Sequence, residues 1–229
     1  GKIMKTIKIA ITALFVSALM VLPSNSAEVR IGISATYAQL EASGTETLKD
    51  SAATTTTTEQ ANAVIPSMFA ELSMDNGLGI GYDLIAGSAD LTGSTKDRIM
   101  VADAFNTGGQ TGNNKANAEV DGVHTIYLIK TFGSGLYVKA GLSQADVNTK
   151  ETLDSGSKYG NESVDGKMFG AGYHKVNDSG IFFRAGVEYT DFDTITLTGD
   201  QVGGTASSFN KIKADVDMAA AKFSIGKAF

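Results

Sequence analysis

The chain has 229 residues, with 25 acidic and 19 basic side chains, a formal net charge of −6, two histidines and no cysteine. The acidic balance argues against a nucleic-acid partner, whose phosphates require a basic face. The absence of cysteine excludes disulfides, thiolate metal ligands and a cysteine nucleophile, and two histidines are too few for a zinc site built mainly of imidazoles, so we expect no metal and no cofactor.

The chain begins with the pattern of a secretory signal peptide over residues 4–26. Two lysines precede an apolar run at residues 9–22, and a proline followed by small residues supplies a cleavage site. A transmembrane anchor is the alternative, but this apolar run is shorter than a spanning helix and a helix breaker follows it. We expect residues 1–26 to be a signal peptide with an upstream extension at 1–3, and residues 27–229 to form one exported domain.

Removal of this segment takes away three lysines and no acid, so the exported domain is more acidic than the whole chain. A strongly acidic domain does not suit docking on anionic lipid headgroups.

Apolar side chains then alternate with small or polar ones, which is the period of two that predicts β-strands. In the first such segment Val29, Ile31 and Ile33 share one face, and Arg30 and Gly32 lie on the other. The pattern recurs in eight segments: residues 29–37, 68–74, 78–84, 123–130, 136–143, 168–173, 181–189 and 219–229.

The connections between these segments are alternately short and long. Three are tight and have hairpin-turn residues, at 75–77, 133–135 and 177–180. Four are long and polar: residues 41–63, 86–120, 143–164 and 191–213. One of them holds the low-complexity run Thr54–Thr58, which we expect to be mobile. Short turns and both termini at one end require an even number of strands, and eight fit.

These features predict an all-β protein, a transmembrane up-and-down antiparallel β-barrel of eight strands. A soluble barrel with an apolar interior is the alternative, because periodicity alone does not say which face is inside. The less aliphatic face is rich in glycine and holds eight charged residues, whereas the aliphatic face carries tyrosines near strand ends. This distribution favours a narrow charged lumen and a lipid-facing exterior with aromatic girdles.

We predict that eight inward charges form a lumen network: Arg30, Glu71, Asp83, Lys130, Lys139, Arg184, Glu188 and Lys222. Buried charges need partners. Similar heights on nearby strands suggest that Arg30 pairs with Glu71, Asp83 with Lys130 or Lys139, and Glu188 with Lys222. Such a network closes the lumen as a structural plug, or alternatively gates a conduit for small ions.

The signal peptide, the segment "GLYVKAGL" after a tight turn and the terminal "KFSIGKAF" together resemble the eight-stranded outer-membrane β-barrel family, the group of the OmpA transmembrane domain, opacity proteins and OmpW-like proteins. The resemblance covers nearly the whole exported domain. It implies that Phe223, Ile225 and Phe229 form the signal read by the barrel-assembly machinery. Lys227 departs from that pattern, because the family usually has an apolar or aromatic residue there.

The resemblance implies localisation in the outer membrane, with membrane lipid and lipopolysaccharide as surroundings. We expect a structural or surface-interaction role, in which long loops contribute to membrane integrity, adhesion or recognition by phage and other surfaces. A narrow porin-like channel is the alternative, and a lipid-modifying enzyme is a third possibility.

An enzyme has little support in the sequence. His124 has no serine two residues on, and His174 lies beside a tight turn. Two aspartate pairs, at 191 and 193 and at 215 and 217, offer oxygen ligands for calcium but lack a surrounding ligand loop. We therefore predict no catalytic, cofactor or metal site.

Overall fold

The structure is a computed structural model that describes residues 27–47, 54–91, 96–99, 113–152, 156–202 and 211–229. The predicted signal peptide, residues 1–26, lies outside the described residues. Among the described residues no helix is long and apolar enough to span a membrane.

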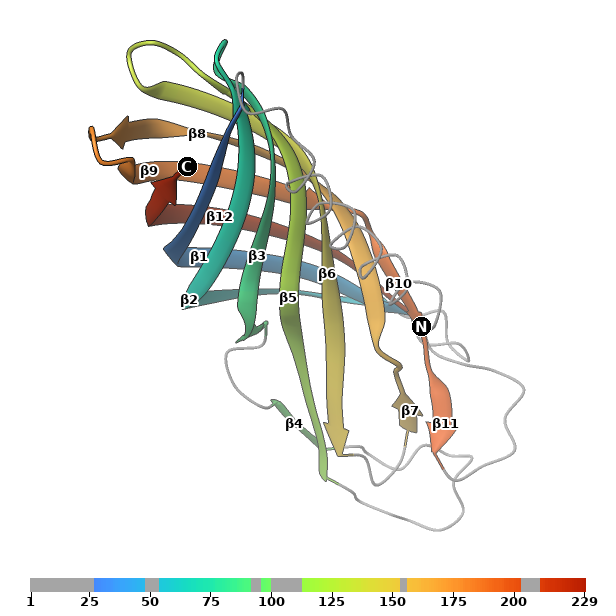
Figure 1. The fold of residues 1–229 in the computed structure, drawn as a ribbon. Coiled ribbons are helices and arrows are strands. Elements are labelled where there is room, and N and C mark those ends of the chain that lie inside the picture. Colours follow the sequence, from blue (N-terminus) through green and yellow to red (C-terminus); the bar gives the residue numbers. More distant parts are fainter. Residues whose placement is uncertain (1–26, 48–53, 92–95, 100–112, 153–155, 203–210) are drawn as a thin grey trace, which may run out of the picture.

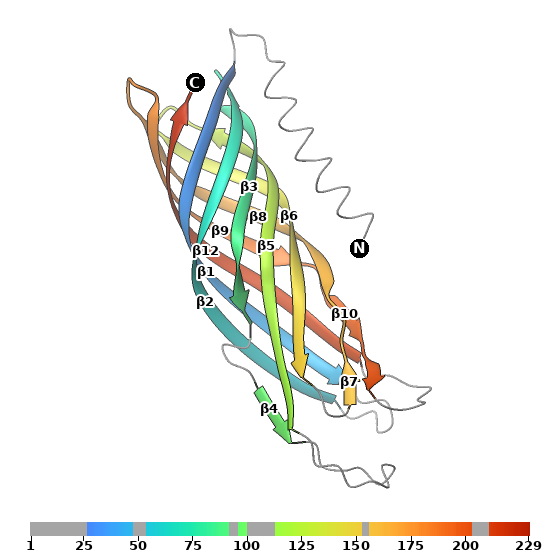
Figure 2. The same cartoon turned by 60° about the horizontal axis from the view of Figure 1, so that its bottom comes forward.

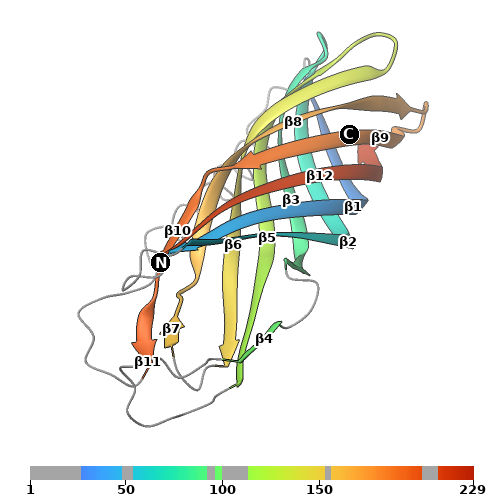
Figure 3. The same cartoon turned by 180° about the vertical axis from the view of Figure 1, so that it is seen from behind.

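Eight long strands form one closed barrel (Figure 1). They are β1 (Ala27–Thr47), β2 (Thr54–Met74), β3 (Leu78–Asp90), β5 (Asn113–Thr131), β6 (Leu136–Thr152), β8 (Glu162–Val176), β9 (Ile181–Phe192) and β12 (Lys211–Ala228). Each pairs antiparallel with the next, and β12 pairs with β1 to close the ring; Figure 3 shows β12 between β9 and β1. The predicted eight-stranded up-and-down barrel is confirmed.

Four short strands extend this barrel. β4 (Lys96–Ile99) pairs with β5 and β10 (Ile195–Thr198) pairs with β12, while β7 (Gly156–Lys158) pairs with β11 (Asp200–Val202). All four lie in regions that the sequence analysis assigned to long loops.

The three tight turns lie at one end of the barrel, together with the C-terminus (Figure 2). Gly77, Gly135 and Gly180 in these turns have positive φ of 78°, 88° and 79°, a conformation that favours glycine. We call the half with these turns, residues 27–37 of β1 and 219–228 of β12, the proximal half. The distal half holds residues 38–47 of β1 and 211–218 of β12.

The strands are longer than the sequence analysis expected. β1 and β2 each have 21 residues and pair from Ala27↔Met74 to Thr47↔Thr54 without a register shift. The expectation that Thr54–Thr58 belongs to a long loop was wrong, because this run is part of β2. Threonine is β-branched and fits an extended ladder even where neither face is buried.

The outer surface of the proximal half is apolar. Large hydrophobic side chains point away from the barrel on all eight strands, among them Ile31, Ile33, Met68, Leu128, Val138, Leu142, Phe169, Phe183, Val187 and Phe223. Tyr37, Tyr173 and Tyr189 lie among them. So large a continuous apolar surface does not suit water and does suit hydrocarbon, with tyrosines at its margins.

One strand has its faces reversed relative to the sequence analysis. On β5 the inward side chains are Thr125, Tyr127 and Ile129, whereas Leu128 is 58% exposed on the outer surface. Lys130 is therefore outward, where its amine donates to the main-chain oxygen of Asn76. The alternation in residues 123–130 could not distinguish the faces, because both carry large apolar side chains.

Candidate functional site in the barrel interior

The proximal interior is organised around Glu71, whose residue exposure is 0%. Arg184 donates to both of its carboxylate oxygens, at 3.0 and 3.1 Å, and Arg30 donates at 3.2 Å. The Tyr127 hydroxyl adds a hydrogen bond at 3.1 Å. Glu71 thus accepts a bidentate arginine, a second arginine and a phenol, an arrangement that satisfies a buried carboxylate.

A second cluster lies beside the first. Lys222 from β12 donates to Asp83 across the interior at 2.8 Å and contacts Glu188 on the neighbouring strand at 3.2 Å. Lys139 from β6 also pairs with Glu188. The predicted contacts Arg30–Glu71 and Glu188–Lys222 are present, whereas the predicted partners of Asp83 were wrong. Asp83 meets Lys222 because the lumen is narrow enough for a lysine to cross it.

Aromatic rings fill the space between the charges. The Arg184 guanidinium lies 5.0 Å from the Phe69 ring centroid and 5.1 Å from that of Tyr137, and the Lys139 amine lies 4.6 Å from that of Tyr127. These are cation–π distances. Glycines directly opposite on the neighbouring strand make room for the rings: a Cβ at Gly81, which pairs with Tyr127, would lie 2.2 Å from the Tyr127 ring.

The network leaves almost no free space. The cavity between Ser34, Phe69, Asp83, Tyr127, Tyr137 and the surrounding charges has a volume of about 10 Å³. That is no more than the space one water molecule needs. Seven of the eight predicted inward charges belong to these two clusters, and Lys130 is the one that lies outside.

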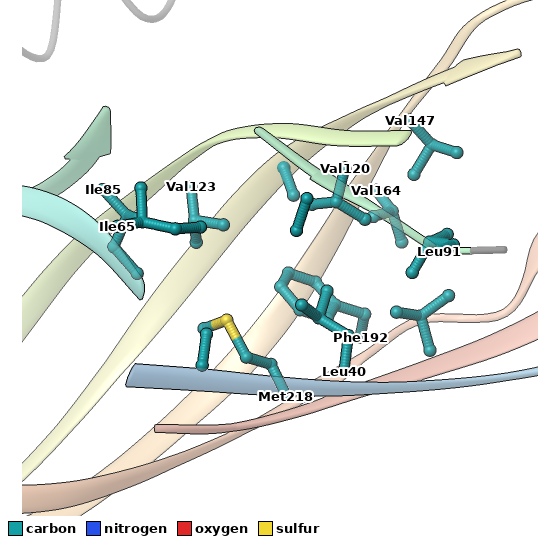
Figure 4. Close-up of a cluster of buried hydrophobic side chains, with 14 of the residues drawn as sticks. Leu40, Ile65, Ile85, Leu91, Val120, Val123, Val147, Val164, Phe192 and Met218 are labelled. Atoms are coloured by element: carbon teal, nitrogen blue, oxygen red, sulfur yellow. The ribbon is translucent and has the colours of Figure 1, made fainter. Parts of the chain in front are cut away.

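The distal interior is apolar, which the sequence analysis did not predict. Figure 4 shows Leu40, Ile65, Val120, Phe192 and Met218 turned toward one another. They belong to a cluster that also holds Ala38, Ile85, Ala89, Leu91, Val123, Ala145, Val147, Val164, Ile195 and Val216. The outward side chains at the same level are polar and exposed: Gln39, Glu41, Gln60, Asn62, Asp121, Lys213 and Asp215. The signal in the sequence was the exchange of polar and apolar positions within one continuous alternation, for example at Tyr37 to Leu40.

The two histidines lie in different surroundings. The His124 Nδ1 atom is 2.5 Å from the Tyr82 hydroxyl, on the outer face of the barrel. His174 is buried in the proximal interior, where its ring packs against Phe182 at a centroid distance of 5.1 Å.

The aspartates proposed as weak calcium ligands each bond to a neighbouring hydroxyl where the structure gives their contacts. Asp217 accepts from the Tyr189 hydroxyl at 2.8 Å and Asp215 from Thr194 at 2.6 Å, and the described residues include no group of three or more potential metal ligands. Phe223, Ile225 and Phe229 are exposed on the outer surface at 70%, 45% and 72%. The proposed assembly residues are thus accessible on the last strand.

No family model and no curated protein matches the chain. Among solved structures it is similar to the outer membrane protein OprG from Pseudomonas aeruginosa, with a TM-score of 0.55, 14% identity, and coverage of 89% of this chain and 97% of that one. It also matches the outer membrane protein AlkL (TM-score 0.49, 10% identity, coverage 91% and 92%) and the attachment invasion locus protein Ail of Yersinia pestis (TM-score 0.36, 12% identity, coverage 86% and 98%). The likeness to OprG shows that the chain has the fold of an outer-membrane β-barrel, as the sequence resemblance implied.

Proposed function

We propose that the protein is an integral outer-membrane β-barrel of a diderm bacterium, with a closed interior and a structural or surface-interaction role. Three observations support the membrane setting: the OprG-like fold, the apolar outer surface of the proximal half, and the charged interior behind it. The distal half, with its polar exterior and apolar core, then projects into the medium as a folded platform.

The observation that carries the closed interior is the cavity of about 10 Å³ between the charge clusters. A path for hydrated ions or small solutes needs a continuous polar channel. Here ion pairs and aromatic rings occupy the proximal interior and aliphatic side chains occupy the distal one. The geometry therefore favours the plug over the narrow channel.

Planar-bilayer recording tests this proposal. Refolded protein should insert without discrete conductance steps, while a porin added to the same bilayers gives them. Regular ohmic steps from the wild-type barrel, at a frequency that follows the amount of folded protein, would contradict the closed interior and favour the transport role.

Orientation is tested with single cysteines, because the chain has none of its own. In intact cells a membrane-impermeant maleimide should label Thr57→Cys in the distal half and should leave Ser134→Cys in a proximal turn unlabelled. Both should react after the cells are lysed. Labelling of Ser134→Cys in sealed cells would reverse the orientation.

For the assembly machinery we propose that Phe223, Ile225 and Phe229 form its recognition signal on the last strand. Deletion of Phe229 should lower the amount of folded barrel in the outer membrane far more than it lowers the urea midpoint after refolding in detergent. Equal membrane levels of the two chains would leave Phe229 as an interfacial anchor only.

The proposal includes no catalytic role. His174 is closed off in the interior and His124 bonds to Tyr82 on the outer face, so neither offers an open general base. The partners we propose are outer-membrane lipid and lipopolysaccharide around the proximal half, and external surfaces or phage at the distal half.

A further inference from the structure

A groove crosses the outer surface of the proximal half over β6, β8, β9 and β12, which are neighbours in the sheet (Figure 3). Its volume is about 680 Å³, within the range of roughly 300–1,000 Å³ that small-molecule sites occupy. The residues that line it include no charged side chain, and most of them are apolar. We call it the outer groove, because it opens away from the charge clusters of the interior.

Small residues form the floor of the outer groove, and rings form its sides. The small outward positions follow one diagonal over three neighbouring strands: Ala171, Ala185 and Ala221. Ala185 lies directly between Tyr173 on β8 and Phe223 on β12, whose side chains are 48% and 70% exposed. The alanine therefore leaves a trough between two projecting rings.

The spacing of the strands sets the width of this trough. Neighbouring strands lie about 4.8 Å apart, so Tyr173 and Phe223, two strands apart, are rooted about 10 Å from each other. Non-bonded carbon atoms pack about 4 Å apart. One hydrocarbon chain above Ala185 can thus contact both rings, whereas two chains side by side do not fit between them.

One end of the outer groove lies at the turn between β5 and β6, where Phe132 and Leu136 belong to its lining. Leu136 is directly opposite Tyr173, and Lys175 follows Tyr173 by two positions on the same face of β8, so Lys175 lies beside that turn. Lys175 is exposed and has no ion-pair or hydrogen-bond partner among the described residues, Asp178 of the following turn included. The apolar trough therefore ends near an unpaired amine.

This arrangement suits a bilayer lipid better than a second copy of the chain. Closed dimers bring the same patch of both subunits together, and two concave patches that face each other leave a void without contacts. A phospholipid instead supplies an acyl chain for the trough and a phosphate for the amine of Lys175. In the proposed orientation the proximal turns face the periplasm, so the phospholipid comes from the periplasmic leaflet.

We propose that the outer groove holds one acyl chain of a phospholipid of the periplasmic leaflet, with its phosphate at Lys175. The rings of Tyr173 and Phe223 hold the chain by contact, and the long stem of Lys175 lets its amine reach the headgroup level. The inference rests on the proposed membrane setting and orientation, because phospholipid must border the proximal half.

The test counts the phospholipid molecules that stay with the folded barrel. The full barrel is refolded in detergent, titrated with a phosphatidylglycerol that has one palmitoyl and one oleoyl chain, and weighed intact by native mass spectrometry. The wild type should retain one lipid, which binds at least tenfold more tightly than any further lipid. Heat modifiability shows that each variant is folded before it is titrated.

Two matched variants test the trough. Ala185→Phe fills the space between the rings and should weaken the binding of the first lipid at least tenfold. Ala140→Phe makes the same change at an exposed alanine of β6 outside the lining of the groove, so it should bind lipid like the wild type. Equal retention by the two variants would show that the bound lipid belongs to a general shell, and would overturn the proposal.

The headgroup is tested with Lys175→Gln, which leaves the trough unchanged. It should weaken the binding of phosphatidylglycerol several-fold and leave unchanged the binding of a diacylglycerol with the same two chains, because that lipid has no phosphate. Equal affinity of Lys175→Gln and the wild type for phosphatidylglycerol would contradict the assigned headgroup position.

Two further outcomes would overturn the proposal: no lipid retained by the wild type at saturating concentration, or a wild-type dimer that Ala185→Phe abolishes, since a second copy would then occupy the groove. Flotation of the refolded barrel with lipid vesicles tests the membrane setting separately. A barrel that floats and retains no lipid contradicts the groove proposal alone, whereas a barrel that does not float contradicts both.

Discussion

The proximal and distal halves of the barrel are built from the same eight strands, but their interiors have opposite polarity. In the proximal half the interior holds charges such as Glu71 and Lys222, and the exterior holds Ile33 and Phe223. In the distal half the interior is an aliphatic cluster and the exterior is polar. The exchange shows that the solvent outside each half, hydrocarbon or water, decides which side chains a strand directs outward.

Different forces hold the two interiors together. The distal cluster gains free energy from removing apolar surface from water, as the core of a soluble protein does. The proximal charges gain little net free energy from burial, and each depends on its partners to offset lost hydration. Single substitutions should therefore act through unpaired charge in the proximal half and through lost packing in the distal half.

The largest effect is expected from Glu71→Gln. The neutral amide leaves Arg184 without a counter-charge in the proximal interior and leaves Arg30 with Glu28 alone, which should destabilise the barrel by about 3–5 kcal/mol. Urea unfolding in lipid vesicles measures this change.

The double variant Glu71→Gln with Arg184→Met is the control. It removes the unpaired charge at the same time, so its cost should be well below the sum of the two single costs. Additive single costs would show that Glu71 and Arg184 are not coupled, and that the proximal half does not depend on charge pairing.

The next effect belongs to the distal half, where Leu40→Ala should cost about 2–5 kcal/mol because it leaves a cavity in the aliphatic cluster. Leu40 is 2% exposed, and its neighbour Gln39 on the opposite face is exposed. Gln39→Ala is therefore the matched control and should change stability little. If Leu40→Ala is as mild as Gln39→Ala, the distal interior is not a packed core.

Sequence alternation was sufficient to place the eight strands and most of their faces. Ile31 and Phe223 are outward and Glu71 and Arg184 inward, as the pattern predicts. The pattern was ambiguous at residues 123–130, where both faces hold large apolar side chains. In the structure Tyr127 faces inward, and its hydroxyl donates a hydrogen bond to Glu71. The alternation within one strand does not reveal a contact between residues on two different strands.

The sequence did not predict the partner of Asp83 or the full length of the strands, and the reason differs between the two. Asp83 and Lys222 are 139 positions apart, and only the barrel's narrow cross-section brings them together. The strands of the distal half have polar outer faces and a threonine run, which in a sequence look like loop composition. The apolar positions between them, such as Leu40 and Val120, were the evidence for continued strands.

A smaller change in stability is expected from an arginine placed on the outer surface, and the same substitution in each half compares the two exteriors. Val187→Arg places a charge on the apolar surface of the proximal half, where lysine or arginine at the bilayer midplane costs about 2–4 kcal/mol. Asn62→Arg places the same charge on the polar outer surface of the distal half and should be nearly neutral. Stability in vesicles compares the two, and equal costs would place both positions in the same medium.

The smallest effect concerns an exposed ion pair of the distal half. Lys150 donates to Glu119, and this hydrogen bond raises the pKa of Lys150 above its usual value. A raised pKa in the folded state means that the pair stabilises the protein below the unfolded-state pKa and that this contribution is lost as the pH rises through the folded-state pKa. Glu119→Gln should therefore lower the pKa of Lys150 in an NMR titration, while the urea midpoint at neutral pH stays almost unchanged because water and salt screen the pair. A large fall in that midpoint would show that surface charge, as well as the aliphatic cluster, holds the distal half together.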